Sequence, residues 1–149
     1  METAKDENGD LTDMLGELRV LLPSAQLLSA FLITVPFAPG FNEVLAGEKH
    51  VFLATFVLSV TALVLFSAPA VQHRLMRPLP DRTRFKHIAT RQIVAGAAAL
   101  SIALVLSTQL VLSTVLGHTL ANLVAAFVAS LILGLWWIMP QLWRSAWKV

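Results

Sequence analysis

Four polar side chains lie in or beside long apolar segments, where they are placed to act on a solute or on a neighbouring helix. Glu17 and Arg19 precede the apolar run that contains Gln26, and Gln109 lies inside a later run. A glutamine at membrane depth either hydrogen-bonds to another helix or contacts a transported solute. We interpret Glu17, Arg19, Gln26 and Gln109 as a polar path or as helix contacts. A glutamine bond across helices is typically worth below about 2 kcal/mol, and we favour this structural role for Gln26 and Gln109.

A second group is a basic segment, QHRLMRPLPDRTRFKHIATRQ, at residues 72–92. Bases close to a membrane surface attract anionic headgroups, at about 1 kcal/mol for each Lys or Arg. The first 19 residues carry six acids and two bases, so an acidic partner or this acidic segment competes with lipid for the same positive charge. The simplest alternative is that the bases only set membrane topology. The predicted lipid or partner contacts are Arg74, Arg77, Arg82, Arg84 and Lys86.

Other chemistry finds little support in the residue types. The chain has no cysteine, and its four histidines, His50, His73, His87 and His118, do not suggest a third ligand for a metal. Neither a nucleophile elbow nor a phosphate loop nor a metalloprotease helix is present. We therefore predict a protein that is not an enzyme, with no metal site, no cofactor and no nucleic-acid partner.

Composition indicates the solvent in which these residues must be positioned. The chain has 149 residues, of which 56% are hydrophobic and 13% charged, with a mean hydropathy of +0.72. Soluble domains are typically about 25% charged. Because a helix needs roughly 20 apolar residues to cross a bilayer, the chain has enough apolar residues for four spans. Little is left for a soluble catalytic domain.

The apolar runs predict an all-α, integral membrane four-helix bundle. Residues 1–10 read as a disordered acidic tail, and an amphipathic N-terminal helix follows from residue 11. Pro36, Pro39 and Gly40 end the first span, and Asp81 is placed to cap the helix that leads into the third. We expect 11–149 to form one membrane domain. The predicted spans are residues 18–38, 51–71, 93–116 and 120–142.

The basic residues also predict an orientation. With four spans, ten of the eleven Lys and Arg residues fall on the side of the termini and the central segment, and Lys49 alone falls on the other. Short cytoplasmic loops carry an excess of Lys and Arg. We therefore predict a multi-pass protein of a bacterial plasma membrane with both termini in the cytoplasm.

Two further patterns concern partners. Small residues recur every four positions in the fourth span, as in Ala121, Ala125 and Ala129 and again in Ala126, Ser130 and Gly134. Such stripes let helices approach closely, so we expect a homo-oligomer or a complex with another membrane protein. The four tryptophans lie at the end of the same span. Trp136, Trp143 and Trp147 are at helical spacing on one face, which is typical of an interfacial aromatic belt.

Two functions remain open. The first is a scaffold or accessory subunit whose basic segment contacts anionic lipid or a partner. The second is a small oligomeric ion channel or proton-coupled transporter. No Asp, Glu, Lys, Arg or His lies in the middle of a predicted span, whereas ion-coupled transporters usually place an ionisable group there. This distribution favours the scaffold.

Two stretches of the chain also carry a resemblance. GELRVLLPSAQLLSAFLITVPF, taken with FSAPAVQHRLMRP, resembles a family of small four-span membrane proteins of actinobacteria whose function is unknown. The resemblance covers about residues 11–116, and the first-span motif is its specific part. It implies the four-span topology. Some members carry an automatic label of sodium:proton antiporter.

Overall fold

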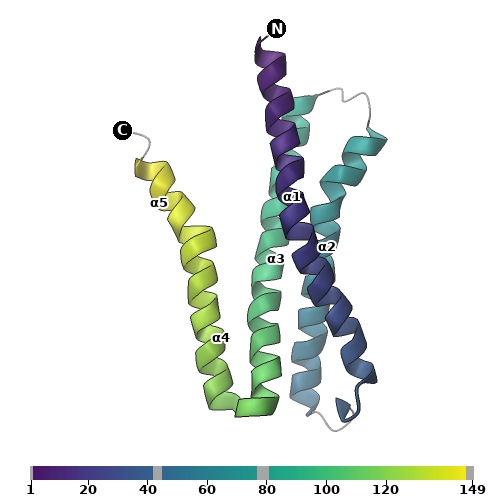
Figure 1. Ribbon diagram of the computed structural model, residues 1–149, viewed down its shortest axis with the longest axis vertical. Helices are drawn as coiled ribbons and strands as arrows, with labels where there is room; N and C mark the ends of the chain where they lie inside the picture. Colours follow the sequence, from purple (N-terminus) through teal and green to yellow (C-terminus); the bar gives the residue numbers. More distant parts are fainter. Residues whose placement is uncertain (1, 42–44, 77–80, 147–149) are drawn as a thin grey trace. The chain divides into compact units, whose positions relative to one another are not determined.

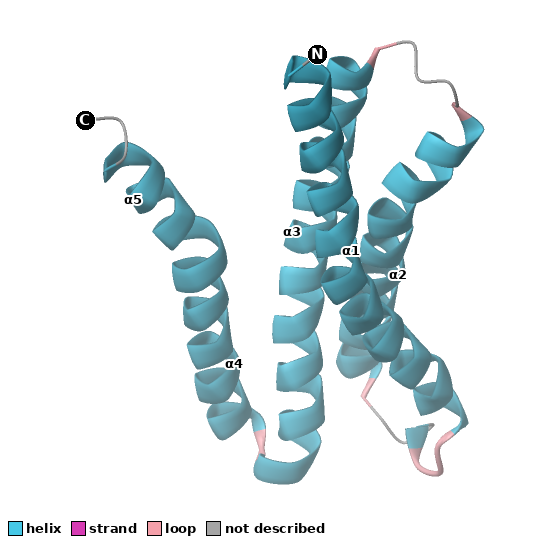
Figure 2. Cartoon of the chain, turned by 45° about the horizontal axis from the view of Figure 1, so that its top comes forward, coloured by secondary structure: helices cyan, strands magenta, loops and turns pink. Residues whose placement is uncertain are grey.

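The computed structural model describes residues 2–41, 45–76 and 81–146, and their side chains from residue 16 onward. None of these residues lies in a strand, which confirms the all-α class. Figure 1 and Figure 2 show that the chain consists mainly of long helices. Their bounds are α1 Glu2–Thr34, η1 Val35–Phe37, α2 Ala46–Leu75, α3 Arg82–Leu116, α4 His118–Ile132, the π-helical segment η3 Leu133–Ile138, and α5 Met139–Ala146.

Helix α1 starts earlier than the sequence suggested. Residues 2–10, predicted to be a disordered tail, are the first turns of α1. Helix formation is cooperative, so a long apolar helix extends backwards at little cost once it has formed. Good helix formers such as Glu2, Ala4, Lys5 and Glu7 favour this extension. The prediction of a disordered backbone over residues 2–10 is therefore wrong.

Four helices of the described chain are long and apolar enough to cross a bilayer, which confirms the four predicted spans. They are Gly16–Phe37, Ala46–Leu75, Arg82–Leu116 and His118–Ala146. The second and third are longer than predicted because each helix continues through polar residues beyond its apolar run. The chain is a multi-pass membrane protein.

The chain divides into two compact units. One contains Met1–Val44 and Phe56–Leu100, and the other contains Leu45–Thr55 and Ser101–Val149. Helices α2 and α3 contribute to both, and the expectation of a single domain over 11–149 stays a prediction.

The core of the first unit is a stripe of small and apolar residues. Its α1 contribution comes from Leu18, Ala25, Ser29 and Leu32, all at most 6% exposed. The hydroxyl groups of Ser29 and Ser59 form a buried hydrogen bond of 2.7 Å between α1 and α2. Buried hydroxyls at this depth require such a partner, because lipid offers none.

Helices α2 and α3 approach closely at Gly96. A Cβ atom added there would lie 2.8 and 2.9 Å from two carbons of the Phe66 ring. Phe66 is itself fully buried, with Ala62 one turn before it on α2. Small residues at a helix contact allow such an approach, as expected for packing within a membrane.

The second unit contains the turn between α3 and α4. Gly117, with φ 79° and ψ 163°, is the single residue between the two helices, in a conformation that favours glycine. The predicted three-residue connection is therefore one residue long. Ala121 and Ala125, from the first predicted stripe of α4, are buried, whereas Ala126 and Ser130 of the second stripe are exposed. At the start of α2 in the same unit, Glu48 accepts a hydrogen bond of 3.4 Å from Ser113 of α3.

The last span is not a uniform α-helix. Residues Leu133–Ile138 form a π-helical segment that ends just before Pro140. Proline has no N–H and its ring collides with the carbonyl group four residues earlier, so a wider turn relieves the strain. This segment departs from the regular α-helical spacing on which the shared face of Trp136 and Trp143 was predicted, so that shared face stays a prediction. Trp147 lies outside the described residues.

Candidate functional site

Asp81 fixes the start of α3, as its position in the sequence predicted. Its carboxylate oxygen Oδ1 accepts a hydrogen bond of 2.9 Å from the backbone N–H of Arg84, and its carbonyl oxygen accepts one from Phe85. An aspartate at this position satisfies an N–H group that the helix leaves unpaired and interacts favourably with the helix dipole. The backbone N–H group of Arg84 is therefore already hydrogen-bonded to a carboxylate of the chain itself.

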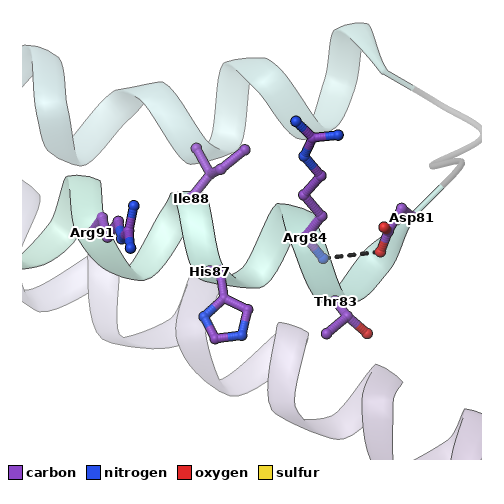
Figure 3. Close-up of a pocket in the computed structure, with 6 residues that line it drawn as sticks. All are labelled: Asp81, Thr83, Arg84, His87, Ile88 and Arg91. Carbon is purple, nitrogen blue, oxygen red and sulfur yellow. Dashed lines mark hydrogen bonds between the residues drawn. The ribbon is translucent and has the colours of Figure 1, made fainter.

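A depression of about 500 Å³, lined by five polar or charged residues and Ile88, lies along the first turns of α3 (Figure 3). We call it the polar depression after these residue types. Figure 3 shows the side chains of Thr83 and His87 leaving α3 on one side and those of Arg84 and Ile88 on the other. Among the described residues Asp81 is the only carboxylate in its wall, and with two arginines this part of the lining is cationic. Its lining consists of Asp81, Thr83, Arg84, His87, Ile88 and Arg91.

An apolar depression of about 580 Å³ adjoins it between the end of α2 and the start of α3. The two share Asp81, Arg84 and Ile88, and the second adds Gln72 and Met76 from α2 and Phe85 from α3. Met76 is 47% exposed and Ile88 44% exposed, so their apolar surfaces are accessible. One arginine thus stands between a cationic and an apolar depression, an arrangement suited to an anionic amphiphile.

Phe85, the aromatic residue in the wall of this apolar depression, packs against His73 of α2. Phe85 is buried, and its ring centroid lies 6.0 Å from that of His73 on α2, with the planes tilted by 51°. Tilted aromatic contacts at this distance are favourable. They tie the polar ends of α2 and α3 together beside the depression.

The predicted contact residues divide into two groups. Arg84 lines both depressions, whereas Arg74, Arg82 and Lys86 line neither. Arg77 lies outside the described residues. His87 and Arg91 were missed. Arg91 follows Arg84 after about two helical turns, and this spacing would have identified it.

The predicted polar path residues are mostly exposed on α1. Glu17, Arg19 and Gln26 are all exposed, and none of them forms a hydrogen bond or an ion pair with another described residue. Gln109 belongs to the other compact unit and is half-buried. Gln26 is exposed in the described chain, so a contact of its side chain with another helix stays a prediction.

A further glutamine escaped the sequence analysis. Gln92 of α3 is half-buried, and its side-chain oxygen is fully enclosed without a hydrogen-bond partner in the described part of the chain. An unpaired acceptor of this kind is a local cost to stability. Within the described residues no three His, Asp or Glu side chains converge as metal ligands do, and the absence of a metal or cofactor stays a prediction.

Comparisons with known proteins place the chain in a family. A search of curated proteins and a search of solved structures return no match. A family model described as "Family of unknown function (DUF6328)" matches residues 2–140, which covers the first three spans, most of the fourth and both depressions. The chain therefore belongs to this family of unknown function, DUF6328.

Proposed function

We propose that this protein is a non-enzymatic scaffold or accessory subunit of the bacterial plasma membrane, and that its basic cytoplasmic face binds anionic lipid. The observation that carries the proposal is the pair of adjoining depressions at Arg84, one cationic and one apolar. A lipid phosphate fits beside Arg84 and Arg91, and the first carbons of an acyl chain fit against Met76, Phe85 and Ile88.

The depth of the site supports this proposal. Helix α3 has 35 residues and is about 50 Å long at 1.5 Å per residue, whereas the hydrocarbon core is about 30 Å thick. The first turns of α3 therefore extend to the headgroup level. The positive-inside rule places that end in the cytoplasm, together with both termini.

The test separates a defined site from general attraction between charges. The double variant Arg84→Gln/Arg91→Gln removes two bases from the polar depression. Arg82→Gln/Lys86→Gln removes two from the same helix outside it. At about 1 kcal/mol for each base, the first should weaken binding to phosphatidylglycerol vesicles roughly 30-fold, and the second should change it much less. Equal losses would show general attraction between charges and no defined site.

A third variant reverses the sign of the effect. Asp81→Asn removes the negative charge that the described residues contribute to the wall but retains a good helix cap. It should tighten binding to phosphatidylglycerol while binding to phosphatidylcholine stays unchanged. Thermal unfolding in detergent checks that each variant is folded.

A small oligomeric transporter or channel is the alternative, and the exposed polar side chains of α1 favour it. In an assembly, Glu17, Arg19 and Gln26 face a neighbouring subunit or a path, and Gln109 adds a polar group to α3. Purified protein in liposomes would be tested for proton, sodium and potassium flux. Flux that is lost in Glu17→Gln supports transport, and silence across all three ions supports the scaffold.

A further inference from the structure

Gln26 occupies an unusual place for an amide. It lies at the centre of the span Gly16–Phe37, its side chain is exposed, and no described residue hydrogen-bonds to it. Its neighbours on the outer surface are apolar, with Leu27 75% and Ile33 53% exposed. Hydrocarbon cannot satisfy the two donors and the acceptor of an amide, so this side chain requires a partner from outside the contacts of its own helix.

The residues around Gln26 form a regular packing surface. Arg19, Pro23, Gln26, Ala30 and Ile33 are all exposed and follow one another at alternating intervals of four and three. This is the heptad spacing by which helices pack side by side at small crossing angles. We call these five residues the outer seam. The small side chains of Pro23 and Ala30 flank Gln26 and allow a second helix to approach its amide.

A buried stripe on the same helix provides a comparison. This buried stripe has heptad spacing, and each of its residues directly precedes a residue of the outer seam. It consists of Leu18, Ala25, Ser29 and Leu32. The buried stripe also has a polar residue near the middle of the span, Ser29, and its hydroxyl is hydrogen-bonded to that of Ser59. The outer seam has the same heptad spacing. Its central polar residue, Gln26, has no hydrogen-bond partner among the described residues.

We infer that a second copy of this chain covers the outer seam, with the two Gln26 amides hydrogen-bonded to each other. All copies enter the membrane in the same orientation, so a two-fold axis along the membrane normal brings identical residues together at identical depth. An amide is self-complementary, because each side chain donates through its NH₂ group and accepts through its oxygen. Among the five residues of the outer seam, Gln26 alone has a side chain that both donates and accepts hydrogen bonds.

Arg19 does not prevent this pairing. It lies seven residues before Gln26, about 10 Å towards the end of the span, where its long side chain reaches the headgroups. Two copies of Arg19 therefore turn outward to lipid phosphates. The inference concerns α1 alone and does not depend on lipid binding at α3.

The first experiment uses the absence of native cysteine. Ala30→Cys places a thiol on the outer seam, and Ser24→Cys places one at an exposed position of α1 outside it. After oxidation in native membranes, Ala30→Cys should give a disulfide-linked dimer and Ser24→Cys should remain monomeric. Equal dimer from both positions, or none from Ala30→Cys, overturns the inference.

The second experiment tests the amide itself. Gln26→Leu should weaken dimerisation roughly tenfold, measured by energy transfer between labelled chains in liposomes. Gln26→Asn keeps the amide and should retain most of the affinity. An exposed leucine is well tolerated in lipid, so the melting temperature of the monomer should not fall. Unchanged dimerisation of Gln26→Leu overturns the role of the amide.

Other occupants of the seam give different products. A photoreactive residue at position 30 should crosslink to a second copy, shown by a product of twice the mass of the chain. A crosslink within one chain shows that another helix of the same chain covers the seam, and a heterologous product shows a different protein. Either result overturns the inference of a second copy.

Discussion

Individual residues at helix contacts tolerate very little added volume in this protein. At Gly96 a single methyl group meets the ring of the fully buried Phe66 at 2.8 Å and the Cβ atom of Leu65 at 3.2 Å. Overpacking of this kind typically costs 1–3 kcal/mol, against roughly 1 kcal/mol gained when alanine replaces glycine in a helix. The overpacking is therefore the larger effect.

We expect Gly96→Ala to lower the free energy of unfolding by about 1 kcal/mol. Gly16→Ala is the matched control, because Gly16 lies in α1 with no atom within 4 Å of the added Cβ. The control should be neutral or slightly stabilising. Unfolding in detergent, followed by circular dichroism, compares the two. If both variants behave alike, the close approach of α2 and α3 is not rigid.

Sequence reasoning at this scale succeeds where the signal is local. The cap by Asp81 was predicted because a helix start needs only one residue of the right type before an apolar repeat. The exposure of Gln26 was not predicted, because all faces of the first span are apolar and hydropathy does not distinguish them. The same limit concealed the pairing of Ser29 with Ser59.

Among the elements, the last span differs most from expectation. Its apolar pattern predicts a continuous α-helix, and the π-helical segment Leu133–Ile138 interrupts it. The signal was present in the sequence, since Pro140 lies inside the span. A proline, however, is accommodated by a kink, a π segment or a helix end, and only packing selects among them.

We expect Pro140→Ala to convert the π-helical segment into α-helix and to turn Trp143 relative to Trp136. Restoring the N–H donor and removing the ring collision should raise the free energy of unfolding by about 1–3 kcal/mol. Chemical shifts of the Cα carbons over residues 133–138 report the backbone change. Ser130→Ala, on the same span before the π segment, is the control and should leave those shifts unchanged. Persistence of the π segment in Pro140→Ala would mean that packing holds it.

At the scale of the whole molecule, the asymmetry of charge dominates. The predicted topology puts ten of the eleven bases on one side of the four spans. The number of spans was predictable because it follows from runs of apolar residues along the chain. The two depressions were not, because they depend on how the polar ends of α2 and α3 meet.

We expect single cysteines to report this orientation in whole cells. Gly47→Cys, in the first turn of α2, should react with a membrane-impermeant maleimide. Thr90→Cys, in the basic part of α3, should react only after the cells are permeabilised. Denatured samples serve as the control for thiol reactivity. The opposite pattern of labelling would reverse the predicted topology.

The bond between Ser29 and Ser59 has a further property. Either hydroxyl can donate, so one arrangement of heavy atoms holds two arrangements of protons. The proton that is not shared can be donated to a carbonyl group one turn earlier on its own helix, as serine hydroxyls in membrane helices commonly do. Reversal of the bond leaves the spacing of the two helices unchanged. The hydrogen bond thus aligns α1 with α2 whichever of the two hydroxyl groups is the donor.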